Sequence, residues 1–331
     1  MRPLTRRAVT PLICGVSLIT ALGWGIATTF AQTAPGPQAP QVSGASQAAQ
    51  AAPPANYQRL IGQVRQHRAE GLTAPDGWLS LVALQRLLPG ETTVGSAAGN
   101  TLVLEHAPAH MLTLQTTGEG AHGAVWLLAA DKAVTVDGAP AKAGARMVAE
   151  GPEASQLRAG PLLATLIERG DRMYLRVKDA GAPTRTHFHG LRWYPVAPRF
   201  FITARWAPAG ASHTLTVPNV LGQIQQEPSP GAAQFTIDGK QVSLEPIVEG
   251  KDTLFFIFRD TTSRTATYGA GRFLYTDLPS NGLNQPGTLV LDFNQAQNPP
   301  CAYTAYATCP LPPIGNRLPV AIPAGEKRYH D

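Results

Sequence analysis

The sequence is poor in charged residues and in cysteine. Charged residues make up 15% of the 331 residues, and there are only three cysteines and four methionines. Globular proteins usually carry about 25% charged residues. The formal charge of +5 includes Arg2, Arg6 and Arg7, which lie in a segment that we expect to be removed, and without them it falls to +2. So small a positive charge argues against a nucleic-acid partner or an anionic membrane surface.

Glycine and proline, by contrast, are abundant. The chain contains 32 glycines and 30 prolines, about 19% of all residues, where roughly 12% is usual. Both residues interrupt helices and are common in turns. This composition therefore predicts short strands joined by turns rather than long helices.

The first 31 residues have the pattern of an export signal. A basic start is followed by the uncharged residues 8–26, and Thr29-Phe30-Ala31 offers a small-x-small cleavage site before Gln32. An uncleaved membrane anchor and a twin-arginine signal, from Arg6-Arg7, are the alternatives. In each case we expect the rest of the chain to be periplasmic or secreted, with membrane contact only through an uncleaved leader.

Residues 32–55 contain no charged and no aromatic residue, so they cannot bury enough surface to fold. We interpret them as a disordered Pro/Ala/Gln linker.

The remaining chain predicts one short helix and two β-rich units. Tyr57, Leu60, Ile61 and Val64 have helical spacing, with Asn56 as the predicted N-cap and an end near Gly71. Short alternating strands follow, with hairpin turns at Asp137-Gly138 and Asp238-Gly239. The fold class is therefore mainly β: residues 56–185 form the helix and a β-sandwich, and residues 186–331 form a second β-rich barrel or sandwich.

Residues 90–95 (GETTVG), Leu102-Val103-Leu104, His110 and Val136-Asp137-Gly138 resemble a forkhead-associated β-sandwich. That family binds phosphothreonine with an arginine after the glycine, where this chain has Ser96. The resemblance therefore implies the fold and argues against phosphopeptide binding.

A second resemblance covers residues 56–331. The segments 76–81 (DGWLSL), 190–195 (GLRWYP), 270–275 (AGRFLY) and 292–318 (DFNQAQNPPCAYTAYATCPLPPIGNRL) are similar to an uncharacterised bacterial family of unknown function. This resemblance implies one conserved unit across both β halves and no particular activity.

Polar residues of these segments form the candidate ligand pocket. Strand alternation in residues 288–294 puts Asp292 and Asn294 on one face, close to Asn298. A network that braces the following loop is the alternative to a pocket wall. The other candidate pocket residues are Tyr268, Arg272, Arg192 and Glu326.

Cys301 and Cys309 are the only cysteines after the leader. In an oxidising compartment two cysteines in a proline-bounded loop predict a disulfide, although a reactive thiol is the alternative. The histidines give no metal-binding pattern: Pro108 lies between His106 and His110, and we expect His187 and His189 to be solvated. We predict neither a metal nor a cofactor.

Two functions remain open at this point. The first is an exported protein that binds a small polar ligand or a cell-envelope component near the 292–301 segment. The second is an extracytoplasmic hydrolase-like enzyme that uses Asp292 as acid or base. Convergence of Asp292, Arg272, Tyr268 and Glu326 in one concave pocket would favour a ligand or active site.

Overall fold

The computed structural model describes residues 51–118 and 123–329. The predicted leader (1–31) and most of the predicted linker (32–55) lie outside these residues. Within the described part the protein is mainly β, as predicted. None of the helices there is long and apolar enough to cross a membrane.

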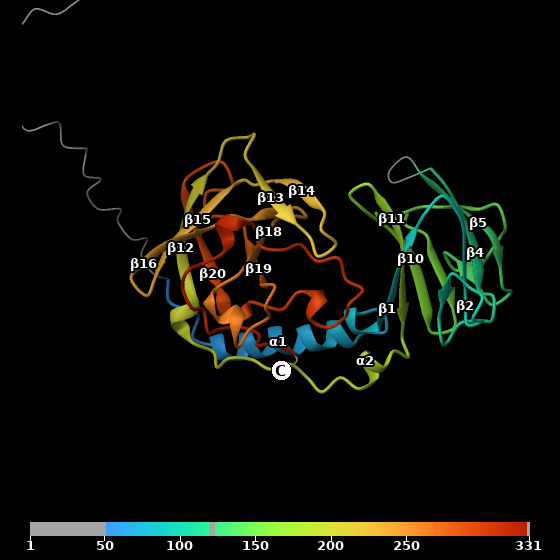
Figure 1. Ribbon diagram of the computed structural model, residues 1–331. Coiled ribbons are helices and arrows are strands. Elements are labelled where there is room, and N and C mark those ends of the chain that lie inside the picture. Colours follow the sequence, from blue (N-terminus) through green and yellow to red (C-terminus); the bar gives the residue numbers. More distant parts are fainter. Residues whose placement is uncertain (1–50, 119–122, 330–331) are drawn as a thin grey trace, which may run out of the picture. The chain divides into compact units, whose positions relative to one another are not determined.

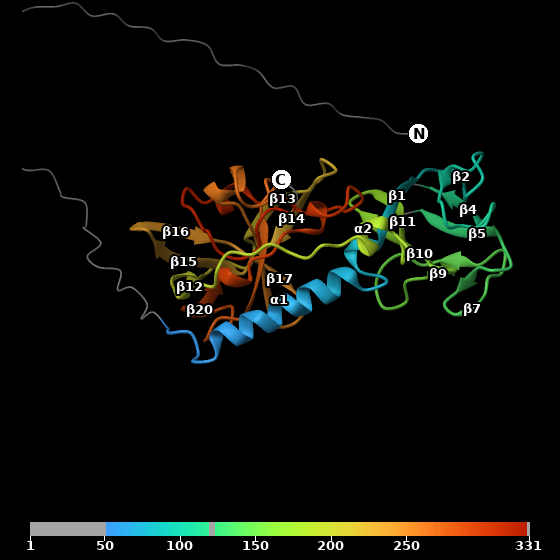
Figure 2. The ribbon, with the colours of Figure 1, turned by 90° about the horizontal axis from the view of Figure 1, so that it is seen from below.

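Helix α1 (Tyr57–Thr73) occupies the predicted position. Its buried residues are Tyr57, Ile61 and Leu72, whereas Leu60 and Val64 are exposed. Asn56 stands at the N-cap position, as predicted, but its side chain makes no capping hydrogen bond. Figures 1 and 2 show α1 running alongside the strands of the second half of the chain.

The first group of strands builds two sheets. The six-stranded sheet has the order β1 (Leu81–Leu87), β11 (Arg172–Asp179), β10 (Leu162–Arg169), β9 (Gln156–Ala159), β6 (Thr135–Val136) and β7 (Ala139–Pro140). The five-stranded sheet has the order β3 (Leu102–Val103), β2 (Gly90–Gly95), β4 (Leu112–Thr117), β5 (Ala124–Ala130) and β8 (Arg146–Met147). Residues of both sheets share one apolar core, which includes Leu114, Leu127, Leu157 and Leu175. The forkhead-associated resemblance itself stays a prediction.

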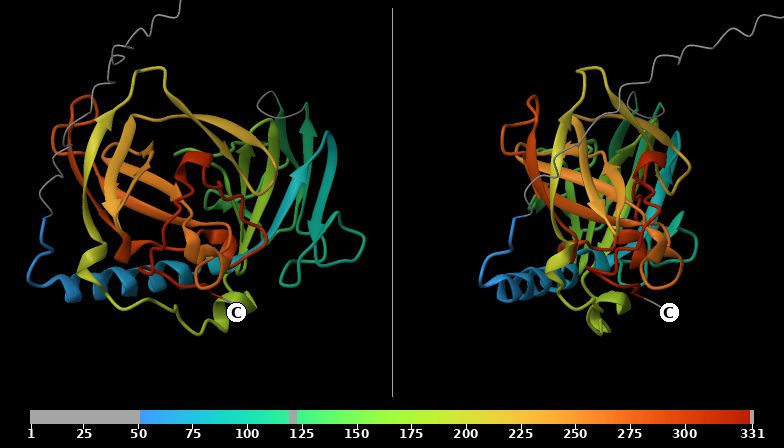
Figure 3. Two further views of the ribbon diagram at one scale, coloured as in Figure 1. Left: turned by 60° about the vertical axis from the view of Figure 1, so that its left-hand side comes forward. Right: turned by 90° about the vertical axis from the view of Figure 1, so that its left-hand side faces the viewer.

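The second group begins after the short helices α2 (Pro183–Thr186) and η3 (Pro198–Phe200). A four-stranded sheet has the order β16 (Lys240–Leu244), β15 (Gly231–Ile237), β12 (Phe201–Pro208) and β20 (Gly287–Asp292). The second group also contains a two-stranded hairpin and a three-stranded sheet. The hairpin consists of β13 (Thr214–Pro218) and β14 (Ile224–Pro228), and the sheet has the order β17 (Ile247–Glu249), β18 (Thr253–Phe258) and β19 (Arg272–Asp277). Figure 3 shows these strands curving around a shared interior.

Both predicted hairpin turns are present. Asp137-Gly138 joins β6 to β7 and Asp238-Gly239 joins β15 to β16, and all four residues have positive φ, between 48° and 82°. Two successive left-handed residues give the turn whose twist matches that of the flanking strands. The Asp-Gly pairs therefore determine these two connections.

Strand β18 is buried on both faces. Leu254, Phe256 and Phe258 belong to the core inside the curved sheet. Phe255 and Ile257 belong to a second apolar cluster on the opposite face, together with Leu81 of the first group and Val217 of β13. Because successive residues of a strand point to opposite faces, the continuous apolar run 254–258 supplies two cores at once. The second of these faces borders the cavity described below.

Four short 3₁₀ turns follow in the loops: η4 (Thr261–Arg264), η5 (Phe293–Gln295), η6 (Pro300–Ala302) and η7 (Ile314–Asn316). Another, η1 (Trp78–Ser80), precedes β1. Residues 76–90 thus contain both a helical turn and a strand.

Candidate functional site

Asp292 ends β20 and lies in a closed hydrogen-bond network. Its Oδ1 accepts from the Tyr57 hydroxyl at 2.5 Å and from the Asn294 backbone N–H at 3.2 Å, and its Oδ2 accepts from Gln295 at 2.8 Å. Asn294 donates to the Tyr57 hydroxyl and exchanges two hydrogen bonds with the backbone of Ala197. Asp292 is 6% exposed and Asn294 is fully buried. The network therefore joins α1, the segment before η3 and the end of β20.

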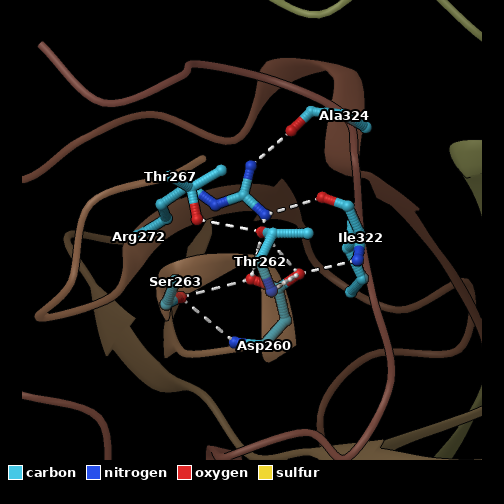
Figure 4. Close-up of polar contacts among 7 residues, drawn as sticks. All are labelled: Asp260, Thr262, Ser263, Thr267, Arg272, Ile322 and Ala324. Atoms are coloured by element: carbon cyan, nitrogen blue, oxygen red, sulfur yellow. Dashed lines mark hydrogen bonds and ion pairs between the residues drawn. The ribbon is translucent and has the colours of Figure 1, made fainter. Parts of the chain in front are cut away.

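Arg272 lies in a separate buried cluster, drawn in Figure 4. Its guanidinium donates to Asp260 at 3.3 Å, to the Ile322 carbonyl at 2.9 Å and to the Ala324 carbonyl. Asp260 also accepts from the Ile322 backbone N–H at 2.6 Å. Both charged side chains are completely buried. This pair fixes the C-terminal segment 322–324 to the loop that follows β18.

Glu326 and Asn298 contact each other in a third cluster. The Asn298 side chain donates to Glu326 at 2.8 Å and its backbone N–H donates at 3.1 Å. The Tyr303 hydroxyl also donates to Glu326, and Arg68 lies 3.8 Å from it. Burial raises the pKa of Glu326, and the Arg68 charge partly offsets this effect. Asn298 Oδ1 is buried without a hydrogen-bond partner among the described residues.

The two remaining candidates bond to the backbone. The Tyr268 hydroxyl donates to the Cys301 carbonyl at 2.9 Å, and Arg192 donates to the Arg328 carbonyl at 2.9 Å. The structure thus groups Asp292 with Asn294 and Asn298 with Glu326. It does not gather the seven predicted pocket residues around one cavity.

A cavity of about 490 Å³ lies next to the third cluster. Asn298 is the one predicted pocket residue that lines it, and Cys309 of the predicted disulfide lines it too. The others come from α1, η1, β10, β11, the strands of the second group and the 297–310 loop: Arg68, Trp78, Arg169, Arg176, Val217, Asn219, Gln225, Glu227, Ile247, Glu249, Phe255, Phe273, Tyr275, Gln297, Pro300, Thr308 and Pro310. A volume of this size is typical of small-molecule sites.

Strand alternation builds one wall of the cavity. Gln225 and Glu227 of β14 line it, and so do Ile247 and Glu249 of β17 and Phe273 and Tyr275 of β19. Each pair is separated by one residue that points to the other face. The wall is therefore the face of the second group that turns away from its own core.

An aromatic surface occupies part of this wall. The rings of Phe255 and Tyr275 stack with centroids 4.8 Å apart, and Phe273 meets Phe255 edge-on at 4.8 Å. Tyr275 is 39% exposed. A planar apolar group could pack against such a surface.

Three arginines contribute to the lining. Arg169 donates to Thr308 at 2.9 Å and pairs with Glu150 at 2.5 Å. Arg68 donates to the Asn298 carbonyl at 2.8 Å. Arg176 lies over the Trp78 ring, 5.4 Å from its centroid. Burial, followed by the nearby Arg169 charge, lowers the pKa of Arg176 to about 10.

Sequence reasoning missed Arg176, Trp78 and the β14–β19 wall. Arg176 stands at an alternating position of β11, RMYLRVKD, which marks it as facing away from the core of its own sheet. Nothing in the sequence shows that another group of strands covers this face.

Cys301 and Cys309 are free cysteines in the structure and lie beside each other. The Cys301 backbone N–H donates to Cys309 Sγ at 3.2 Å, and the Cys309 N–H donates to Cys301 Sγ at 3.3 Å. The hydrogen bond between the two thiols lowers the pKa of Cys301 and raises that of Cys309. The predicted disulfide is not formed here and stays a prediction.

His187 and His189 are exposed, as expected. In residues 51–118 and 123–329, no group of three or more His, Cys, Asp or Glu side chains is arranged to hold a metal ion.

Comparison with known proteins relates part of the chain to a family. The family described as "Protein of unknown function (DUF1684)" matches residues 186–327. This match supports the expected resemblance to an uncharacterised family over the second group of strands, and it does not include residues 56–185.

Among the solved structures that match is one that covers a comparable share of the chain. It is the solution NMR structure of an uncharacterised protein of Haloarcula marismortui, 28% identical, covering 43% of this chain and 78% of that one with a TM-score of 0.37. So low a score transfers neither fold nor function. No curated protein matches the chain.

Proposed function

We propose that this protein is exported and binds a small polar ligand, such as a component of the cell envelope, in the 490 Å³ cavity. The observation that carries the proposal is the cavity itself, which combines an aromatic surface with the partly exposed Arg176. Binding sites typically combine an apolar lining with a few polar groups that orient the ligand.

Support for export comes from the sequence of residues 1–31, with its basic start, uncharged run and small-residue exit. Mass spectrometry of the protein from the cell envelope should find an N-terminus near Gln32. An intact Met1 in the membrane fraction would replace the cleaved leader with an anchor.

Ligand binding can be tested by closing the cavity. Gln225 is exposed on β14 and lines the cavity, so Gln225→Trp places a large ring at its edge. Gln226, the next residue, is also exposed but does not line the cavity, so Gln226→Trp is the matched control.

Native mass spectrometry of protein purified gently from the cell envelope should detect a bound small molecule in the wild type and in Gln226→Trp, but not in Gln225→Trp. Equal occupancy in both variants would place the bound molecule elsewhere, and an empty wild-type protein would count against the proposal.

The hydrolase-like alternative depended on Asp292. That carboxylate does not line the cavity, and both of its oxygens accept hydrogen bonds from neighbouring residues. These contacts favour ligand binding over catalysis by Asp292.

A further inference from the structure

Arg176 differs from the other two arginines of the cavity. Among the described residues its guanidinium has no carboxylate within ion-pair distance and no hydrogen-bond acceptor. Its Nε is buried without a hydrogen-bond partner, as is that of Arg68. The Trp78 ring packs against the guanidinium, and the charges of Arg169 and Glu150 act on it from beyond contact distance. Arg169 and Arg68, in contrast, are both occupied by protein groups.

Arg176 is partly buried, and a charge in such an environment without a close counter-ion is costly, so proteins usually pair it. The indole face offsets part of the cost and holds the guanidinium in place. The two carboxylates of the cavity, Glu227 and Glu249, belong to β14 and β17, and neither is within ion-pair distance of Arg176. The Glu249 side chain is largely exposed, and desolvation of its buried part raises its pKa.

This arrangement indicates which chemical groups a complementary ligand carries. A guanidinium offers parallel N–H donors that match the two oxygens of a carboxylate or phosphate. The stacked rings of Phe255 and Tyr275 offer a surface for a planar apolar body. Both features line one cavity.

Resting on the proposed function, we propose that the ligand is an organic anion whose acidic group pairs with Arg176 and whose planar body packs against Phe255, Phe273 and Tyr275. A carboxylate and a phosphate share this chemistry. The assignment also explains why an arginine whose guanidinium bonds to no described protein group stands on the cavity face of β11.

Isothermal titration calorimetry with three naphthalene compounds tests this proposal on the wild-type protein. Naphthoate and naphthyl phosphate carry an acidic group, and naphthalenemethanol has the same rings without charge. We expect at least one of the two anions to bind about tenfold more tightly than the alcohol or better. Their ranking shows whether a carboxylate or a phosphate fits better, with inorganic phosphate as the ring-free reference.

Variants then locate the charge. Arg176→Gln should weaken binding of the preferred anion about tenfold or more, and Arg176→Lys should retain part of the affinity. Arg158→Gln is the control, because Arg158 is exposed on β9 of the same sheet and does not line the cavity. Thermal melting of each variant reports whether it is folded.

The outcomes separate the inference from the proposed function. If the alcohol binds as tightly as the anions and Gln225→Trp abolishes binding, the cavity binds ligands but does not select anions, and only the inference fails. Unchanged anion binding in folded Arg176→Gln also overturns the inference alone. If no probe binds at millimolar concentration and native mass spectrometry finds no bound molecule, both fail.

Discussion

The hydroxyl of Tyr57 donates a 2.5 Å hydrogen bond to Asp292 Oδ1, across 235 residues of sequence. This bond attaches the first turn of α1 to the end of β20. Burial, followed by the bond to Asp292, raises the pKa of Tyr57, so its hydroxyl remains a donor at neutral pH. Asp292 therefore braces the fold.

Asp292→Asn should accordingly destabilise the protein. The amide keeps one acceptor oxygen but turns an NH₂ group toward the existing donors, which costs roughly 1–3 kcal/mol. Urea unfolding measures the change, with Asp277→Asn, an exposed residue at the end of β19, as control. If Asp292→Asn loses no more unfolding free energy than the control, Asp292 does not brace the fold and is again a candidate for ligand binding.

Arg272→Met should lower the free energy of unfolding more than Asp292→Asn does. It leaves Asp260 in a fully buried site without its counter-ion, a loss of roughly 3–5 kcal/mol. Arg264→Met, at an exposed position of η4, should have little effect. Similar unfolding midpoints for the two variants would mean that the buried pair does not hold the C-terminal segment.

The cysteines should form a disulfide in protein isolated from an oxidising compartment. Each backbone N–H already donates to the sulfur of the other residue. Peptide mapping without reductant should join Cys301 to Cys309, and replacing both with serine should remove roughly 2–3 kcal/mol of stability. Two free thiols in periplasmic protein would show that the pair stays reduced.

His106 should make stability depend on pH. Its hydrogen bond to Asp179, at 2.6 Å, raises its pKa above the ordinary 6.5. The folded state therefore holds this proton more tightly, and the contribution is fully present below pH 6.5 and lost as the pH rises through the raised pKa. Unfolding measured across this range should show a smaller pH dependence for Asp179→Asn. An unchanged profile would mean that the pair does not contribute.

Local patterns predicted the elements better than the site. Alternation correctly brought Asp292 and Asn294 together, where the Asn294 side chain donates to Asp292 at 3.2 Å. The Asp-Gly pairs located two hairpins. Both effects depend on neighbouring residues. The predicted pocket around Asp292 depended instead on which groups donate hydrogen bonds to its carboxylate. Tyr57, in a helix far away in sequence, does so.

The cavity could not be predicted from the sequence, because it too depends on contacts between distant segments. Arg176 and Tyr275 each look like an ordinary outward-facing strand residue. Only the packing of the strands of the second group against β10, β11 and α1 makes them walls of one cavity. Sequence periodicity specifies which face a residue is on, but not which element covers that face.

A crystal structure of the protein with the preferred naphthalene anion tests the central claim most directly. The account predicts the acidic group within hydrogen-bond distance of the Arg176 guanidinium and the rings against Phe255 and Tyr275. A ligand bound outside this cavity, or a cavity left empty at a concentration that saturates binding in solution, would contradict it.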